Sequence, residues 1–166
     1  MKLSDVALED VRWWINSAIL SKRHINHGPI DFELATDASK EGWGASLGEA
    51  VTGGRWSLSE STLHINVLEI KAVLLGLQSL CKEKDNCHIK LLSDNTTAVS
   101  YLSKMGGTHS PQCNTITRDI WLWCIDKSIW LTPAHIPGVD NVKADMASRV
   151  FNDKTEWQLE KSVFTQ

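Results

Sequence analysis

The sequence predicts an α/β fold in which helices flank a mixed five-stranded sheet. The chain has 166 residues, of which 42% are apolar and 22% are charged, an ordinary composition for one domain with a buried core. Residues 32–58 contain three short strand patterns joined by turns, which is typical of antiparallel hairpins. The strands expected after them are separated by helices, which indicates parallel pairing.

The first half of the chain is expected to form a helix, a linker and the hairpins. Ser4 can cap a helix over residues 4–22, and a Gly-Pro pair indicates a linker over residues 24–31. The hairpin strands are expected at residues 32–37, 43–51 and 55–58. A turn over residues 38–42 joins the first two strands, and Thr52-Gly53-Gly54 is expected to form the second turn.

The second half of the chain is expected to alternate helices with strands. Apolar residues at helical spacing predict a long helix over residues 63–82. The elements expected after it are a strand at 87–92, helices at 96–104 and 113–127, a strand at 128–134 and a helix at 141–149. In open sheets of this kind, ligands bind at the carboxyl ends of the parallel strands.

Charge and cysteine usage limit the classes of function. Lys plus Arg number 17 and Asp plus Glu number 20, and this net charge of −3 disfavours strong independent binding to a phosphate backbone. The four cysteines lack zinc-ligand spacing and are expected to be free thiols of an intracellular protein, in the cytoplasm or nucleus. Neither a signal peptide nor a membrane segment is expected, since acids precede the first apolar stretch and interrupt the most apolar run.

Two acids are expected at the ligand-binding edge of the sheet. Asp37 ends the first strand and Asp94 ends the fourth, although Asp is also common as a turn or helix cap. Glu69 has small or apolar neighbours at helical spacing and therefore faces the sheet. A buried carboxylate is costly unless it pairs with a cation, which is either a metal ion or a side chain such as Lys71 or Arg55.

A fourth acid, Asp145, begins the last helix, where an acid also stabilises the helix N-terminus. Together the four acids suggest one oxygen-rich site. Carboxylate oxygens are the ligands that Mg²⁺ prefers, and four acids suit two ions, the arrangement that clamps a phosphate during in-line displacement.

The order of these motifs resembles that of a ribonuclease H domain over roughly residues 32–150. The matching stretches are Thr36-Asp37-Ala38-Ser39, Leu68-Glu69-Ile70-Lys71-Ala72, Ser93-Asp94-Asn95, and His135 to Asp145 with Gly138, Asn141 and Ala144 at the family's spacing. Finer features resemble the ribonuclease H of retroelement reverse transcriptases, especially DIRS-type retrotransposons. They are Gly42-Trp43-Gly44-Ala45, Thr52 to Ser57, His64-Ile65-Asn66, Asp94 to Val99 and Gly106-Gly107-Thr108.

The resemblance implies endonucleolytic hydrolysis of the RNA strand of an RNA–DNA hybrid, leaving 5′-phosphate and 3′-hydroxyl ends. Asp37, Glu69, Asp94 and Asp145 match the family's metal-binding acids, which hold two Mg²⁺ ions, and Mn²⁺ is expected to substitute. His135 matches a mobile histidine that assists proton movement or product release. The alternative for His135 is an ordinary solvated loop histidine.

The resemblance also marks substrate-binding positions. The residues are Ser39, His64, Asn66, Asn95 and Asn141. Many relatives carry Thr-Asn-Gln where this chain has His64-Ile65-Asn66, and the family's basic protrusion is reduced to Lys104 and Arg118, so we expect a weaker grip on the hybrid.

Three segments are expected. Residues 1–31, with Trp13 and Trp14, form a helical arm that connects to a reverse transcriptase domain of the same polyprotein, residues 32–150 form the nuclease, and residues 151–166 form a tail. Because two divalent ions raise the net charge only to about +1, we expect the polymerase to supply most of the grip. Most of five other tryptophans are expected to pack in or beside the core, with base stacking by one of them as the alternative. They are Trp43, Trp56, Trp121, Trp123 and Trp130.

Other functions remain open. The main alternative is a catalytically retired domain that serves as a nucleic-acid-binding or protein-docking module, although the intact acids argue against it. Two related nucleases fit less well. Proofreading exonucleases need Asp-x-Glu on the first strand, where Asp37 is followed by Ala38-Ser39, and integrases need a later Glu in a region predicted here to be a strand.

Overall fold

The computed structural model describes residues 3–17, 20 and 27–151 and contains one five-stranded sheet in the order β3-β2-β1-β4-β5. The strands are β1 (Phe32–Ala38), β2 (Gly42–Leu47), β3 (Ala50–Arg55), β4 (His88–Ser93) and β5 (Trp130–His135). β1 pairs antiparallel with β2, and β2 pairs antiparallel with β3, whereas β4 runs parallel to both β1 and β5. The predicted mixed sheet is confirmed.

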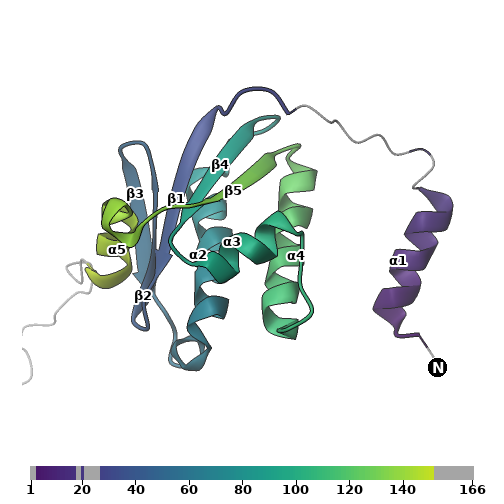
Figure 1. Cartoon of the computed structure of the whole chain (residues 1–166), viewed down its shortest axis with the longest axis horizontal. Helices are drawn as coiled ribbons and strands as arrows, with labels where there is room; N and C mark the ends of the chain where they lie inside the picture. The colour runs from purple at the N-terminus through teal and green to yellow at the C-terminus, as the bar shows by residue number, and fades with distance from the viewer. Residues whose placement is uncertain (1–2, 18–19, 21–26, 152–166) are drawn as a thin grey trace, which may run out of the picture.

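Helices cover both faces of this sheet (Figure 1). The α-helices of the described chain are α1 (Asp5–Asn16), α2 (Ile65–Leu80), α3 (Thr96–Ser103), α4 (Pro111–Asp126) and α5 (Val142–Arg149), with 3-10 turns η2 (Glu60–Thr62) and η3 (Gly138–Asp140). Successive strand residues face opposite sides. Accordingly, Gly44 of β2 faces the backbone of α5, whereas Ala45 faces Gly76 of α2.

The main core lies between the sheet and α2, α3 and α4. Leu34 of β1 and Leu91 of β4 are fully buried there, together with Ile70 and Leu77 of α2. A Cβ on Gly76 would lie 2.9 Å from Cβ of Ala45. This glycine therefore lets α2 lie close to the central strands, which carries Glu69 on the same helix towards the sheet.

The predicted position of the second hairpin turn is wrong. The turn lies at Gly48 and Glu49 between β2 and β3, where Gly48 has a φ of +60°. Gly53 and Gly54 instead lie within β3. A Cβ on Gly53 would be 2.6 Å from the carbonyl oxygen of Ala147 in α5, so the Gly-Gly pair serves close helix packing and not a turn.

The first helix is shorter than predicted. Ser4 caps it through a 3.3 Å hydrogen bond from the backbone N–H of Ala7, as expected, but α1 ends at Asn16 and not at residue 22. Lys22 and Arg23, at the predicted end, lie outside the described residues, as does the predicted tail beyond Phe151. Within the described chain, α1 contacts α4 through Asp10 and Arg118, whose charged atoms lie 3.5 Å apart.

Cysteine and tryptophan environments agree with the expectations. All four cysteines are free. Trp56 and Trp121 are buried, and Trp43, Trp123 and Trp130 pack against the core. In the described part of the chain, no helix combines the length and apolar character needed to cross a membrane.

We predict that Gly53→Ala destabilises the protein more than Gly54→Ala. The Cβ added at position 53 would meet backbone atoms, costing about 1–3 kcal/mol in the free energy of unfolding, as other overpacked sites do. At Gly54 a Cβ would meet Nε1 of the Trp43 side chain at 3.1 Å, and a side chain can shift. Urea unfolding of both variants measures the difference, and an equal or reversed order would contradict this packing.

Candidate active site

Three carboxylates meet at the edge of the sheet where β1 and β4 end. Asp37 is the penultimate residue of β1, Asp94 directly follows β4, and Glu69 lies in the second turn of α2. One ligand oxygen from each of these side chains lies within 4.8 Å of the others. Because β1 and β4 are parallel, their carboxyl ends meet at one edge, and α2 brings the third acid to it.

Glu69 has the most perturbed environment of the three. The residue is only 5% exposed, and its Oε2 has no hydrogen-bond partner among the described residues. Burial, followed by the charges of Asp37 and Asp94, raises the pKa of Glu69 to about 8, against the lowering effect of a backbone hydrogen bond at Ala38. An unpartnered buried carboxylate oxygen is a costly arrangement unless a cation binds there.

The side chains proposed as cation partners of Glu69 bind elsewhere. Lys71 forms an ion pair with Glu60 at 2.5 Å. The guanidinium of Arg55 lies 4.4 Å from the ring centroid of Phe151. Lys71, the alternative to a metal ion as the partner of Glu69, therefore pairs with another acid, since it lies two positions further along α2 and faces η2.

Asp37 is also buried, but one of its oxygens is satisfied. The residue is 4% exposed, and its Oδ2 accepts a 2.6 Å hydrogen bond from the hydroxyl of Ser148 in α5. Burial raises the pKa of Asp37, the Ser148 hydrogen bond lowers it, and the charges of Asp94 and Asp145 raise it further. Burial is thus the main cause of a raised pKa at both Asp37 and Glu69 in the metal-free protein.

Asp145 stands apart from the three clustered carboxylates. Its Oδ1 accepts a 2.7 Å hydrogen bond from Nε of Arg149, one turn later in α5. It lies close enough to raise the pKa of Asp37 but does not belong to the cluster within 4.8 Å. The fourth acid therefore lies beside the cluster and forms an ion pair with the exposed Arg149.

The clustered acids fit a hard divalent cation. Three carboxylates converge, and one of them presents a buried oxygen without a partner among the described residues. Mg²⁺ and Mn²⁺ both favour carboxylate oxygens. Asp37, Glu69 and Asp94 are therefore the residues that could hold such an ion.

The predicted polar residues described next lie at the end of β5 and at the starts of α2 and α3. His135, exposed at the end of β5, has Nε2 3.1 Å from the carbonyl oxygen of Asp94. Asn95 caps α3 by accepting from the N–H of Ala98, and its Nδ2 donates to Oδ1 of Asn66 at 3.1 Å. The exposed His64 caps α2 through Nδ1. His135 and Asn95 thus lie next to Asp94, and Asn66 reaches it through Asn95.

The other two residues predicted to bind substrate are buried and form hydrogen bonds within the protein. Ser39 donates to the carbonyl oxygen of Ser148 at 2.7 Å and accepts from the N–H groups of Glu41 and Gly42. Asn141 is 2% exposed and donates through Nδ2 to the carbonyl oxygen of Thr36 at 2.9 Å. Both side chains therefore tie α5 to β1 in this structure.

Sequence reasoning missed Ser148, which contacts Asp37 directly. The available signal was helical spacing, because Ser148 lies three positions after Asp145 and shares its helix face.

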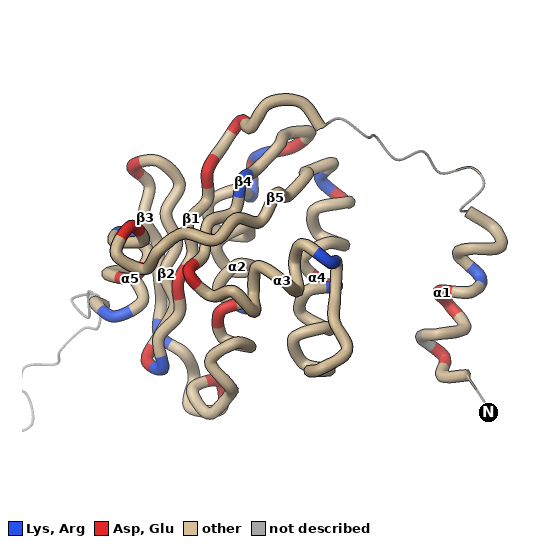
Figure 2. The backbone as a smooth tube through the Cα atoms, viewed as in Figure 1, with Lys and Arg blue, Asp and Glu red and all other residues tan. Residues whose placement is uncertain are grey.

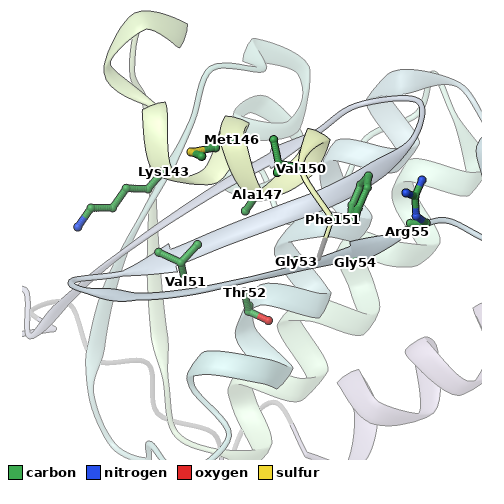
Figure 3. Close-up of a pocket in the computed structure, with 10 residues that line it drawn as sticks. All are labelled: Val51, Thr52, Gly53, Gly54, Arg55, Lys143, Met146, Ala147, Val150 and Phe151. Carbon is green, nitrogen blue, oxygen red and sulfur yellow. The ribbon is translucent and has the colours of Figure 1, made fainter. Parts of the chain in front are cut away.

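In the part of the chain that the structure describes, basic residues are not gathered around this site (Figure 2). Figure 2 shows Lys and Arg scattered over several elements of the described chain. A separate groove of about 680 Å³ lies between β3 and α5 (Figure 3), lined in part by Val51, Arg55, Met146 and Phe151. None of the three clustered acids lines this groove, so it is distinct from the acidic site.

No family model and no curated protein matches this chain. Solved structures do. Ribonuclease H1 from the halophilic archaeon Halobacterium salinarum matches at 19% identity and a TM-score of 0.59, covering 70% of this chain and 92% of its own. The chain has the ribonuclease H fold. LC11-ribonuclease H1, solved in complex with an RNA/DNA hybrid, matches at 17% identity and a TM-score of 0.61, covering 70% and 93%.

The N-terminal ribonuclease H domain of a Mycobacterium tuberculosis protein matches at 16% identity and a TM-score of 0.51, covering 69% of this chain and 95% of its own. The predicted ribonuclease H-like fold class is thus confirmed. At these identities the likeness establishes the fold, and the chemistry has to be argued from the chain's own residues.

We predict that Glu69→Gln flattens the dependence of stability on pH in EDTA. The pKa of Glu69 rises from 4.5 to about 8 on folding. Between these values the folded protein holds a proton that the unfolded chain releases. The contribution of Glu69 to stability is therefore largest below pH 4.5 and is lost as the pH rises towards 8.

The wild-type melting temperature should fall across this window by about 5 °C or more. Thermal unfolding at several pH values measures it. Glu83→Gln, at an exposed position after α2, serves as the control and should follow the wild type. A Glu69→Gln profile as steep as that of the control would contradict the assigned environment of Glu69.

Proposed function

We propose that this chain is a ribonuclease H that hydrolyses the RNA strand of RNA–DNA hybrids with the help of divalent cations. The observation that carries the proposal is the cluster of Asp37, Glu69 and Asp94, with the unpartnered buried oxygen of Glu69 inside it. The fold supports it, as does the hybrid bound to one structure of the same fold.

The clustered acids would hold Mg²⁺ or Mn²⁺. When bound, such ions lower the pKa of water and neutralise charge on the phosphate group and the leaving oxygen. Asp37 and Glu69 are fixed by burial, so their oxygens are in place before substrate arrives. Asp94, which is half-buried, is the member of the cluster most accessible from solvent.

A second cation requires a fourth ligand, which we assign to Asp145. Its partner Arg149 has a side chain that is 60% exposed, and such exposed ion pairs contribute only about 0–1 kcal/mol. Exchange of Arg149 for a divalent ion therefore costs little. This exchange would bring Asp145 into the set of metal ligands expected from the sequence.

His135 and the asparagines are proposed to act on the substrate. The exposed imidazole of His135, next to the backbone of Asp94, can accept or donate a proton near the cleaved phosphate. Asn66 and Asn95 place amide donors beside the acids, where they can contact sugar hydroxyls and phosphate oxygens of the hybrid. Recognition would then depend on helix shape and 2′-hydroxyl groups and not on base sequence.

The retroelement features of the sequence favour a reverse transcriptase as partner. On α1, the exposed fractions are 50% for Trp13, 70% for Trp14 and 72% for Ile15. Apolar side chains this exposed are typical of a surface that packs against another domain. We propose that residues 1–31 connect to the polymerase. The polymerase would then supply most of the contacts to the phosphate backbone of the hybrid, since the basic residues of this chain are scattered.

We predict that the wild type cuts RNA–DNA hybrid in Mg²⁺ or Mn²⁺ and that Asp94→Asn lowers cleavage by about 100-fold or more, as loss of a metal ligand commonly does. Double-stranded DNA and double-stranded RNA should remain uncut. Asp126→Asn, at an exposed acid at the C-terminal end of α4, is the matched control and should cleave like the wild type. Labelled hybrids resolved on denaturing gels measure rates and product ends.

Three outcomes would contradict the proposal in different ways. Equal activity of Asp94→Asn would place the chemistry outside the cluster. A preference for duplex DNA would indicate another nuclease of related fold. Hybrid binding without cleavage at millimolar metal would favour the retired docking module.

A further inference from the structure

Helix α5 lies unusually close to the sheet. A Cβ on Gly44 would be 2.6 Å from the backbone nitrogen of Ser148, and one on Gly53 would be 2.6 Å from the carbonyl oxygen of Ala147. Side chains on either strand position would push the helix away. This close approach allows the short side chain of a serine to reach the strand that carries Asp37.

Ser148 makes a short hydrogen bond to Asp37. The serine is fully buried, and its Oγ lies 2.6 Å from Oδ2 of Asp37, a distance typical of a hydroxyl that donates to a charged carboxylate. The same Oγ lies 2.9 Å from the carbonyl oxygen of Asp145. The carboxylate is the closer and the charged acceptor, so it is the stronger partner of the single hydroxyl proton.

Two further hydrogen bonds fix the position of this hydroxyl. Ser39 donates to the carbonyl oxygen of Ser148 at 2.7 Å, and Asn141 donates to the carbonyl oxygen of Thr36 at 2.9 Å. They tie α5 to β1 on both sides of Asp37 in the sequence. The hydroxyl of Ser148 is therefore held by the packing of the helix and not only by its own rotamer.

We propose that Ser148 is a positioning residue that orients the Asp37 carboxylate for cation binding. The inference rests on the proposed function of the acidic cluster. A carboxylate offers about four lone-pair positions, and one donor leaves the others available to a metal. A neutral hydroxyl is suited to this role because it adds no positive charge that would compete with the cation, whereas a lysine or arginine would form an ion pair with Asp37.

The test compares Ser148→Ala, Ser148→Cys and Ser148→Thr with Ser46→Ala, a control at a buried serine of β2 outside the cluster. The first readout is the Mn²⁺ dissociation constant of the full chain without substrate, measured by titration calorimetry. The second is hybrid cleavage, separated into KM for the hybrid and the Mg²⁺ concentration for half-maximal rate.

We expect Ser148→Ala to bind Mn²⁺ about 10–100-fold more weakly and to need correspondingly more Mg²⁺, as for other residues that hydrogen-bond a metal ligand. KM for the hybrid should stay at the wild-type value. Cysteine fills the space of serine but donates weakly, so Ser148→Cys should resemble Ser148→Ala, whereas Ser148→Thr keeps the hydroxyl and should recover most of the affinity. Ser46→Ala should bind Mn²⁺ like the wild type.

An Mn²⁺ affinity of folded Ser148→Ala within about twofold of the wild type, against the expected 10–100-fold loss, would overturn the inference. So would full recovery by cysteine, since that would assign the effect to packing. If Ser148→Ala does not fold, Ser148→Cys and Ser148→Thr decide by the same criteria. Calorimetry tests the role of Ser148 separately from the proposed nuclease activity. If Mn²⁺ binding depends on Ser148 but the wild type does not cut hybrid, the positioning role holds and the proposed nuclease function is wrong.

Discussion

The mutual repulsion of three clustered carboxylates, two of them buried, is the constraint on which this structure depends. Glu69 and Asp37 are buried beside Asp94, and one oxygen of Glu69 has no partner among the described residues. Such an arrangement opposes folding in the absence of a cation. The packing of the helices on the sheet therefore has to hold these groups together.

Close packing from both faces of the sheet provides that restraint. Gly76 lets α2 approach β1 and β2 on one face, while Gly44 and Gly53 let α5 approach on the other. Each helix brings a functional group to Asp37, since α2 carries Glu69 and α5 carries Ser148. The glycines thus set how close each helix lies to the sheet. A bulkier residue at any of the three positions would move a helix that carries part of the site.

Much of the site could be predicted from the sequence because it depends on local pattern. Strand ends located Asp37 and Asp94, and helical spacing placed Glu69 on the sheet-facing side of its helix. The turn at Gly48 was missed because a Gly-Gly pair has the same local signature in a turn and in a strand packed under a helix. The contact between Ser148 and Asp37 depends on how α5 docks on the sheet, which no local pattern specifies. The pairing of Asp145 with Arg149 is a contact between residues four positions apart in one helix, and their spacing in the sequence was an available signal for it.

The proposed chemistry requires that Asp37, Glu69 and Asp94 together bind a divalent cation. Anomalous diffraction from crystals soaked in Mn²⁺ tests it most directly, with Glu69→Gln crystals as the comparison. We expect an anomalous peak within coordination distance of all three carboxylates in the wild type, and a peak at lower occupancy or no peak in Glu69→Gln. An empty cluster at millimolar Mn²⁺, or a peak that Glu69 does not contact, would contradict it.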